Sequence, residues 1–238
     1  MNLFTIADLH LPLGADKPMD IFGGWDNYVT RIETNWKHLV KNDDTVVIGG
    51  DISWAISLKQ ATADFAFINS LPGQKIILKG NHDFWWSTVT KINQFLNENH
   101  FDTIKILHNN CYSDGKIGIC GTRGWLYDGT GEKDKKIISR ECGRLETSIN
   151  CALKNGVQPI VFLHYPPVYG EFIAEEIVDI LEKYQIKNVY YGHIHGYAAA
   201  NTVSEYNNIK MKMVSSDQVG FTPVFITACE KFEEIGKN

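Results

Sequence analysis

The sequence lacks the features that mark membrane, secreted and nucleic-acid-binding proteins. None of its apolar runs is long enough to cross a membrane, and no basic leader opens the chain. Its net charge is −5 and its pI is about 5.9, which argues against bulk nucleic acid as a partner. The five cysteines form no Cys-x-x-Cys pair, so we expect reduced thiols in a cytoplasmic protein.

Two common catalytic motifs are also missing. There is no Gly-x-Ser-x-Gly sequence, which argues against a hydrolase with a serine nucleophile. There is no Gly-x-x-x-x-Gly-Lys phosphate loop either, which argues against an NTP-driven motor or a kinase. No internal repeat, low-complexity segment or linker divides the chain, and we expect a single domain over residues 1–238.

Short apolar runs alternate with longer amphipathic stretches along most of the sequence. The runs predicted to be buried strands are 3–7, 45–48, 75–78, 159–163 and 188–191. The stretches predicted to be helices are 25–40, 57–70, 87–98, 136–153 and 171–184. This alternation indicates an α/β protein with a largely parallel sheet and right-handed crossovers.

The pattern changes after about residue 197. The runs 200–205 and 209–214 flank Asn207-Asn208, a typical hairpin turn, and 223–228 is a further strand candidate. We expect this part of the chain to add antiparallel strands, in the same sheet or in a second one.

Each of the five buried strands is followed by residue types that bind metals. The blocks are Asp8-Leu-His10, Gly50-Asp51, Gly80-Asn81-His82-Asp83, His164 and Gly192-His193-Ile194-His195. The carboxyl ends of strands in α/β sheets form the ligand-binding edge, so these distant residues are expected to converge. Asp8 and His10 are two positions apart, as are His193 and His195, which favours projection to one side of an extended chain.

Each block alone is a weak signal. Asp-x-His arises often by chance, and a single histidine after an apolar run is more often a hydrogen-bonded core residue. Together they are informative, because five of the eight histidines lie in these blocks. His38, His100 and His108 lie in helical or connecting segments, and we assign them no role.

The ordered set of blocks resembles the signature of the calcineurin-like metallophosphoesterase superfamily. The resemblance spans residues 8–195 and implies two packed mixed β-sheets flanked by helices, a four-layer α/β/β/α sandwich. It implies a first metal held by Asp8, His10, Asp51 and His195. It implies a second metal held by Asp51, Asn81, His164 and His193.

The resemblance also implies a reaction. Imidazoles, carboxylates and one amide oxygen suit two divalent or trivalent ions such as Mn, Fe, Zn or Co. Two such ions about 3.5–4 Å apart can activate a bridging hydroxide that attacks phosphorus. His82 would donate a proton to the leaving oxygen or stabilise the charge that develops there. Asp83 would orient His82, or alternatively would cap the helix that follows.

Departures from two subfamilies narrow the substrate. Asp51 is followed by Ile-Ser-Trp-Ala rather than by the Asp-Arg-Gly of the protein phosphatases, and the third block ends in Asp83 rather than glutamate. Purple acid phosphatases use a tyrosine ligand in a block unlike Asp8-Leu-His10. A small phosphodiester, nucleotide or phosphomonoester therefore fits best. The alternative function is a catalytically silent scaffold for protein assembly, and the sequence leaves the oligomeric state open.

Several further residues have two interpretations. The aromatic residues beside the blocks either line the pocket or pack in the core: Trp54, Trp85, Trp86 and Tyr165. Arg123 either holds a phosphate oxygen or forms a surface ion pair. The polar stretch 121–136 is either a solvated surface loop or a loop at the mouth of the site.

Overall fold

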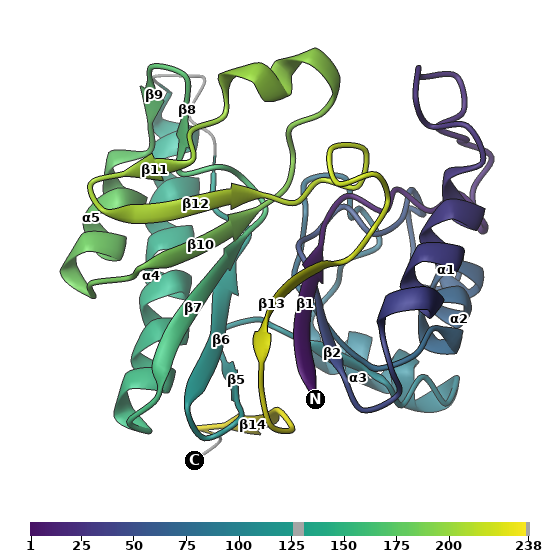
Figure 1. Cartoon of the computed structure of the whole chain (residues 1–238), viewed down its shortest axis with the longest axis horizontal. Helices are drawn as coiled ribbons and strands as arrows, with labels where there is room; N and C mark the ends of the chain where they lie inside the picture. Colours follow the sequence, from purple (N-terminus) through teal and green to yellow (C-terminus); the bar gives the residue numbers. More distant parts are fainter. Residues whose placement is uncertain (126–130, 237–238) are drawn as a thin grey trace.

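The computed structural model describes residues 1–125 and 131–236, and it consists of two mixed β-sheets packed face to face with helices on both outer sides (Figure 1). The predicted four-layer α/β/β/α architecture is therefore confirmed. All five buried strands expected from the sequence are present, each within one residue of its predicted limits.

The first sheet has the strand order β13-β1-β2-β3-β4. Its strands are β1 (Asn2–Ile6), β2 (Thr45–Ile48), β3 (Gln74–Ile77), β4 (Ile104–Ile106) and β13 (Val224–Ala228). The first four are parallel, and β13 is antiparallel at the edge. Three helices cover its outer face: α1 (Tyr28–Leu39), α2 (Thr62–Ser70) and α3 (Val89–Glu98).

The second sheet has the order β11-β12-β10-β7-β6-β5-β14. Its strands are β5 (Cys111–Ser113), β6 (Ile117–Thr122), β7 (Gln158–Leu163), β10 (Asn188–Tyr191), β11 (Glu205–Tyr206), β12 (Ile209–Met213) and β14 (Glu233–Ile235). Its outer face packs against α4 (Glu132–Lys154) and α5 (Glu175–Lys183). A separate hairpin pairs β8 (Val168–Tyr169) with β9 (Phe172–Ile173).

The unbroken apolar character of the central strands follows from burial on both faces. In β1, Leu3 points into the core between the sheets, whereas Phe4 and Ile6 pack against the helices. The same alternation holds in β2, where Val47 points inward and Val46 points outward. Successive side chains of a strand project to opposite faces, so a strand between two cores is apolar at every position.

The C-terminal expectations are only partly correct. Asn207 and Asn208 form the turn, each with a positive φ, as predicted. The segment 200–205 is not a strand, because the chain from Gly196 to Asn201 forms the 3₁₀ helix η1 and only the end of the segment enters β11. Strand β12 pairs antiparallel with β11 across this turn, as expected, but on its other side it is parallel to β10. Positions 198–200 are alanines, and alanine is less common in strands than β-branched residues are.

Four of the five predicted helices, α1, α2, α3 and α5, begin two to five residues later than predicted, and α4 begins four residues earlier. Helix α2 starts at Thr62 rather than at 57, and α5 starts at Glu175 after the short β9. Within the described ranges, no helix combines the length and the apolar character needed to span a membrane.

Candidate metal centre

The metal-ligand types of the sequence gather where the parallel strands of both sheets end, at the top of Figure 1. Asp8 follows β1 and Asp51 follows β2, and both are buried. The backbone amide of Asp8 donates to Gly50 O at 2.9 Å, and the amide of His10 donates to Asp51 O at 2.9 Å. These bonds keep the two loops side by side beyond the ends of their strands.

Tight turns bring the loops together. Asp8, His10, Asp51 and His193 all have positive φ between 46° and 73°. Non-glycine residues adopt this conformation infrequently, with aspartate and histidine among the more tolerant types. Position 80 requires glycine for a different reason, the close approach of a neighbouring loop. A Cβ at this position would collide with the Asp51 carboxylate.

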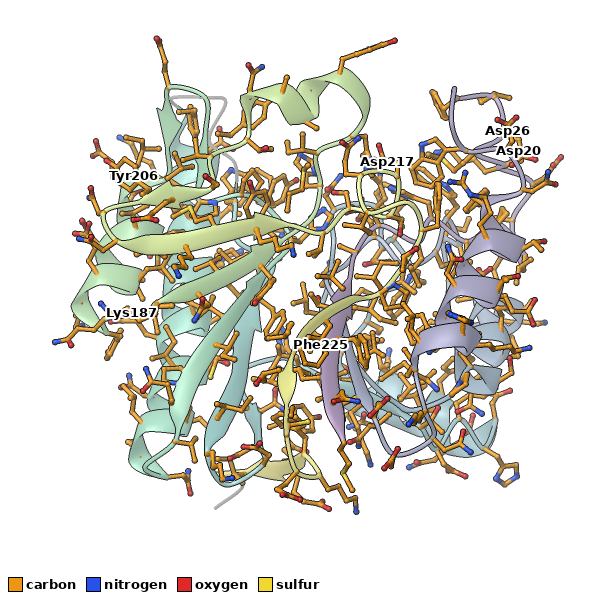
Figure 2. The ribbon with its side chains drawn as sticks, in the orientation of Figure 1. Asp20, Asp26, Lys187, Tyr206, Asp217 and Phe225 are labelled. Carbon is orange, nitrogen blue, oxygen red and sulfur yellow. The ribbon has the colours of Figure 1, made fainter. Side chains whose placement is uncertain are left out.

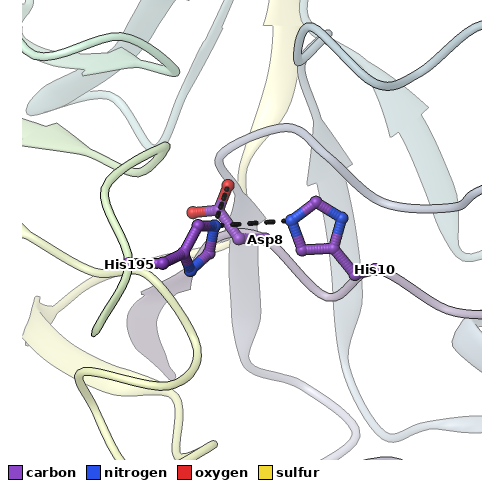
Figure 3. Close-up of side chains that lie close together, drawn as sticks. All are labelled: Asp8, His10 and His195. Atoms are coloured by element: carbon purple, nitrogen blue, oxygen red, sulfur yellow. Dashed lines mark hydrogen bonds and ion pairs between the residues drawn. The ribbon is translucent and has the colours of Figure 1, made fainter. Parts of the chain in front are cut away.

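The first group of donors contains Asp8, His10 and His195. The Nε2 atom of His195 lies 3.4 Å from His10 Nε2 and 3.7 Å from Asp8 Oδ1 (Figure 3). These atoms come from both sheets, and they lie close enough together to hold one cation.

The second group lies on the other side of Asp51. His164 Nε2 is 2.6 Å from Asn81 Oδ1 and 3.6 Å from Asp51 Oδ2. His193 Nδ1 is 2.9 Å from the same Asn81 oxygen. Asp51 Oδ2 also lies 3.8 Å from His10 Nε2, so this one oxygen faces both groups.

Hydrogen bonds fix which atoms face the centre. His164 Nδ1 donates to Gly49 O at 3.0 Å, because a carbonyl can only accept. Its Nε2 therefore carries a lone pair in the neutral ring and faces two acceptor oxygens with no proton between them. Asp8 accepts the His193 amide on Oδ2 at 2.9 Å, which leaves its buried Oδ1 without a partner.

The pKa values of these groups have one physical cause. Burial raises the pKa of Asp8 to about 8 and that of Asp51 to about 6, and the two carboxylates repel each other. Burial lowers the pKa of His164 and of His193 to about 3, which keeps both imidazoles neutral. Neutral imidazoles and buried, mutually repelling carboxylates are a donor set that a cation would stabilise. The residues present therefore fit a metal.

Asp217 is a functional candidate that the sequence reasoning missed. Its Oδ1 accepts a hydrogen bond from His195 Nδ1 at 2.8 Å, and its Oδ2 accepts from the Gly196 amide at 2.9 Å. Burial opposes the charged ring, but this bond and the charge of Asp8 raise the pKa of His195. A carboxylate behind a ligating histidine fixes its tautomer and ring orientation. No motif marks this aspartate.

The structure gives Asp83 neither of the two roles weighed above. Its buried carboxylate accepts hydrogen bonds from the amides of Gly80, Asp51 and Ile52 at 2.7, 3.0 and 2.8 Å. It also accepts from Trp85 Nε1 at 2.9 Å. Both oxygens are therefore committed to the backbone, and within the described residues no bond joins them to the His82 ring. Thr88, not Asp83, caps α3.

His82 is instead placed by Asp51. The His82 amide donates to Asp51 Oδ1 at 2.7 Å, and its half-buried ring lies 4.7 Å from the ring of Trp54. Burial lowers the pKa of His82, and the charge of Asp51 opposes this shift.

The aromatic neighbours divide between site and core. Trp54 stacks on His10 with ring centroids 4.7 Å apart, and the ammonium of Lys17 lies 3.6 Å from the centroid of the same indole. Trp85 is a core residue, packed edge-on against Phe65. Trp86 packs at the border of the same core, and the Tyr165 ring lies 4.2 Å from that of His193.

Arg123 forms an ion pair, although its partner is buried rather than on the surface. Its Nη2 lies 3.6 Å from Oε1 of Glu141, and Thr122 Oγ1 donates to the other oxygen of Glu141 at 2.5 Å. The Arg123 carbonyl accepts the amide of His164 at 3.0 Å, so this residue borders the second donor group. The polar stretch 121–136 that follows lies partly outside the described residues, at 126–130.

A cavity of about 940 Å³ lies elsewhere, between α3, β4 and the end of α4, lined by residues such as Asn93, Lys105 and Asn150. None of the metal-ligand candidates lines it. We place the functional site at the donor cluster, because there the described residues bring metal-ligand types together around the unpartnered, buried Asp8 Oδ1.

Comparison with solved structures supports the fold. A protein of unknown function from Aquifex aeolicus matches with 16% identity and a TM-score of 0.52, covering 94% of this chain and 95% of that one. The phosphopantetheinyl hydrolase of Mycobacterium tuberculosis matches with 14% identity and a TM-score of 0.54, covering 90% and 88%. A Thermus thermophilus protein matches with 10% identity and a TM-score of 0.56, covering 94% and 97%. No match is found among curated proteins.

The family model of the calcineurin-like phosphoesterases matches residues 1–197, which include every donor described above. This match covers most of the 238 residues, and the resemblance noted in the sequence is confirmed. The Asp and His groups at the strand ends form a candidate metal-binding site of the kind such enzymes need. The chain belongs to the calcineurin-like phosphoesterase family.

Proposed function

We propose that the protein is a dinuclear-metal-dependent phosphohydrolase that acts on a small phosphodiester, nucleotide or phosphomonoester. Asp8, His10, Asp51 and His195 would hold one ion. Asp51, Asn81, His164 and His193 would hold the other. Imidazole, carboxylate and amide donors without a thiolate suit Mn, Fe, Zn or Co.

One observation carries this proposal. Acceptor atoms from both sheets converge in a buried place without protons to pair them, as His164 Nε2 and Asn81 Oδ1 do at 2.6 Å. Asp51 Oδ2 faces both donor groups, at 3.8 Å from His10 Nε2 and 3.6 Å from His164 Nε2. This geometry supports a shared ligand between two ions.

When bound, the ions would supply Lewis-acid chemistry, lowering the pKa of water and neutralising phosphoryl charge. The chain's own residues would orient the metal ligands and supply the proton for the leaving oxygen. Asp217 holds His195 in one tautomer through the bond at 2.8 Å. His82 would be protonated once the nearby phosphate charge raises its pKa, and the imidazolium would then donate a proton to the leaving oxygen and return to the neutral ring.

Lys17 would help attract the anionic substrate. It is an exposed cation held over Trp54 at 3.6 Å, on the side of the site that carries His10 and His82. The chain as a whole has a net charge of −5, so local cations matter for a phosphate anion.

The proposal is tested with protein loaded with Mn²⁺ and assayed on 4-nitrophenyl phosphate and on its methyl diester. Asp51→Asn should abolish metal-dependent turnover. His82→Ala should lower kcat by about 10²–10⁴-fold while the metal content stays unchanged. His38→Ala is the matched control, because His38 is exposed on α1, and it should have no effect.

Unchanged turnover in Asp51→Asn would contradict the proposed centre. A protein that binds no metal and hydrolyses neither substrate would instead favour the silent scaffold. Measurement of bound metal by atomic absorption separates these outcomes.

A further inference from the structure

Large apolar side chains are exposed in the segments that follow the strand ends where the candidate metal centre lies. Ten large hydrophobic residues are exposed in the described part of the chain, and six of them lie in the segments that follow β1, β2, β3 and β10. We call these six the apolar rim: Leu13, Ile21, Phe22, Ile56, Phe84 and Tyr197. Scattered exposed hydrophobic residues are normal, but a concentration around one site is informative.

The rim is tied to the site by short stretches of chain. Phe84 is two residues after His82, and their rings are 6.0 Å apart. Tyr197 is two residues after His195, which limits the distance between their Cα atoms to about 7 Å. The carbonyl of Phe22 accepts the amide of Trp25, whose ring lies 5.8 Å from that of His10.

These side chains are far more exposed than packing requires. Phe84 is 61% exposed, Ile56 is 72% exposed and Ile21 is 79% exposed, while Tyr197 is fully exposed. The neighbouring Trp54 and Trp85 are used for contacts within the protein, so the fold can bury apolar groups in these loops. The rim therefore has apolar surface to offer a ligand.

We propose that the apolar rim binds the hydrophobic part of the substrate, so that preferred substrates are phosphoesters with an alkyl chain beside the phosphate. This inference rests on the proposed function and names a substrate class for the same site. Phe84 beside His82 places apolar surface next to the group that would protonate the leaving oxygen. The phosphate would occupy the donor cluster while the chain lies across the rim.

A substrate fits the rim better than a bilayer or a second protein does. The six residues come from the segments after β1, β2, β3 and β10, the strands that most of the donors also follow, so a protein that covered them all would close the site to substrate. The exposed carboxylates Asp16, Asp20 and Asp26 lie in the same loop as Ile21 and Phe22, and they oppose an anionic membrane. Figure 2 shows Asp20 and Asp26 at the end of the molecule that carries Asp217.

The test measures chain-length dependence in Mn²⁺-loaded protein, below the micelle-forming concentration of each substrate. The substrates are methyl, butyl and octyl diesters of 4-nitrophenyl phosphate. We expect kcat/KM to rise about tenfold or more from methyl to octyl. The variants Phe84→Ser and Ile56→Ser should each reduce the octyl-to-methyl ratio by about threefold.

Leu153→Ser is the matched control. Leu153 is an exposed leucine near the end of α4, at the opposite edge of the sheet from His164, and its loss should leave the ratio unchanged. Calorimetric titration adds a readout without turnover, in which octylphosphonate should bind about tenfold more tightly than methylphosphonate. Circular dichroism confirms the folding of each variant.

The outcomes separate this inference from the proposed function. Hydrolysis of all three diesters at one kcat/KM would overturn the inference and leave the proposed function standing. The rim variants could instead abolish binding to neutral lipid vesicles or abolish dimerisation. If the octyl-to-methyl ratio of kcat/KM is also flat, that result would overturn the inference. Hydrolysis of none of the substrates, nitrophenyl phosphate included, would overturn both.

Discussion

At the scale of single residues, the partners of the candidate ligands matter as much as the ligands. His195 Nδ1 is held by Asp217, and His164 Nδ1 is held by the Gly49 carbonyl. In both rings the second nitrogen is thereby directed at the centre. The Gly49 carbonyl belongs to the backbone and cannot be removed by mutation. Asp217 is a side chain, so its substitution can test the orienting hydrogen bond.

Asp217→Asn should weaken Mn²⁺ binding by about 10–100-fold, because the amide no longer fixes the His195 tautomer or supports its basicity. Titration calorimetry measures the affinity. Asp26→Asn removes an exposed carboxylate at the same end of the molecule and serves as the control (Figure 2). Equal affinities in the two variants would show that Asp217 has no orienting role.

Lys75 is a buried amine at the start of β3, at the opposite end of the strand from Asn81 and His82. Its Nζ donates to the carbonyls of Leu71 and Gly73 at 2.6 and 2.8 Å, and burial lowers its pKa from 10.5 to about 7. The unfolded chain therefore binds more protons than the folded chain between these two pH values. Stability should rise with pH across this window.

The expected gain is about 1.4 kcal/mol per pH unit between pH 7 and 9, measured by urea unfolding. In Lys75→Met this rise should disappear, whereas the exposed Lys59→Met should keep it. A wild-type stability that stays flat from pH 7 to 9 would show that the buried amine is not deprotonated in the folded state.

At the scale of elements, the loop 80–83 behaves as one hydrogen-bonded unit around Asp83. That carboxylate joins the amides of Gly80 and Asp51, from the loops after β3 and β2, so it sets the distance between two neighbouring donor loops. We propose that it positions Asp51 and the loop that carries Asn81 rather than contacting substrate.

Asp83→Asn should lower the free energy of unfolding by about 2 kcal/mol, since one acceptor oxygen becomes a donor that faces buried amides. Metal affinity should fall together with stability. Chemical denaturation and metal titration measure the two effects, with the exposed Asp43→Asn as control. Loss of turnover with unchanged stability and metal binding would instead favour a direct catalytic role.

The elements also show how far the sequence could be interpreted. The central strands were predictable, because burial on both faces leaves an unbroken apolar run such as Val46, Val47 and Ile48. Strand β6 was missed, since Gly118 and Gly121 interrupt its pattern; a Cβ at Gly118 would meet Ala152 of α4. Strands β4 and β5 have three residues each, too few for a periodic signal.

The same limit applies to the site. The donors follow predictable strands, so their convergence at one edge could be expected from the order of the blocks. Asp217 and Lys17 lie in irregular loops, and only tertiary contacts bring them to His195 and Trp54. The hydrogen bonds of Asp83 could not be foreseen either, because its acceptor role depends on backbone amides, which no residue type in the sequence reveals.

At the scale of the whole molecule, metal binding and stability should be coupled. A ligand at about 100 times its Kd stabilises a protein by about 2.7 kcal/mol. For a chain of this size the melting temperature should therefore rise by about 5–11 °C with Mn²⁺ and return after EDTA. Calorimetry measures the shift, and the single domain proposed over residues 1–238 predicts one transition. Asp51→Asn should show no Mn²⁺ shift, and a shift of wild-type size in this variant would point to metal bound elsewhere.

The donor atoms are divided between the halves of the sandwich. Asp8, His10, Asp51 and Asn81 follow strands of the first sheet, whereas His164, His193 and His195 follow strands of the second. Neither sheet alone supplies all the ligands proposed for either ion. A partly synthesised or half-unfolded chain would accordingly be inert toward phosphate esters, so the protein would gain its reactivity only at the last stage of assembly.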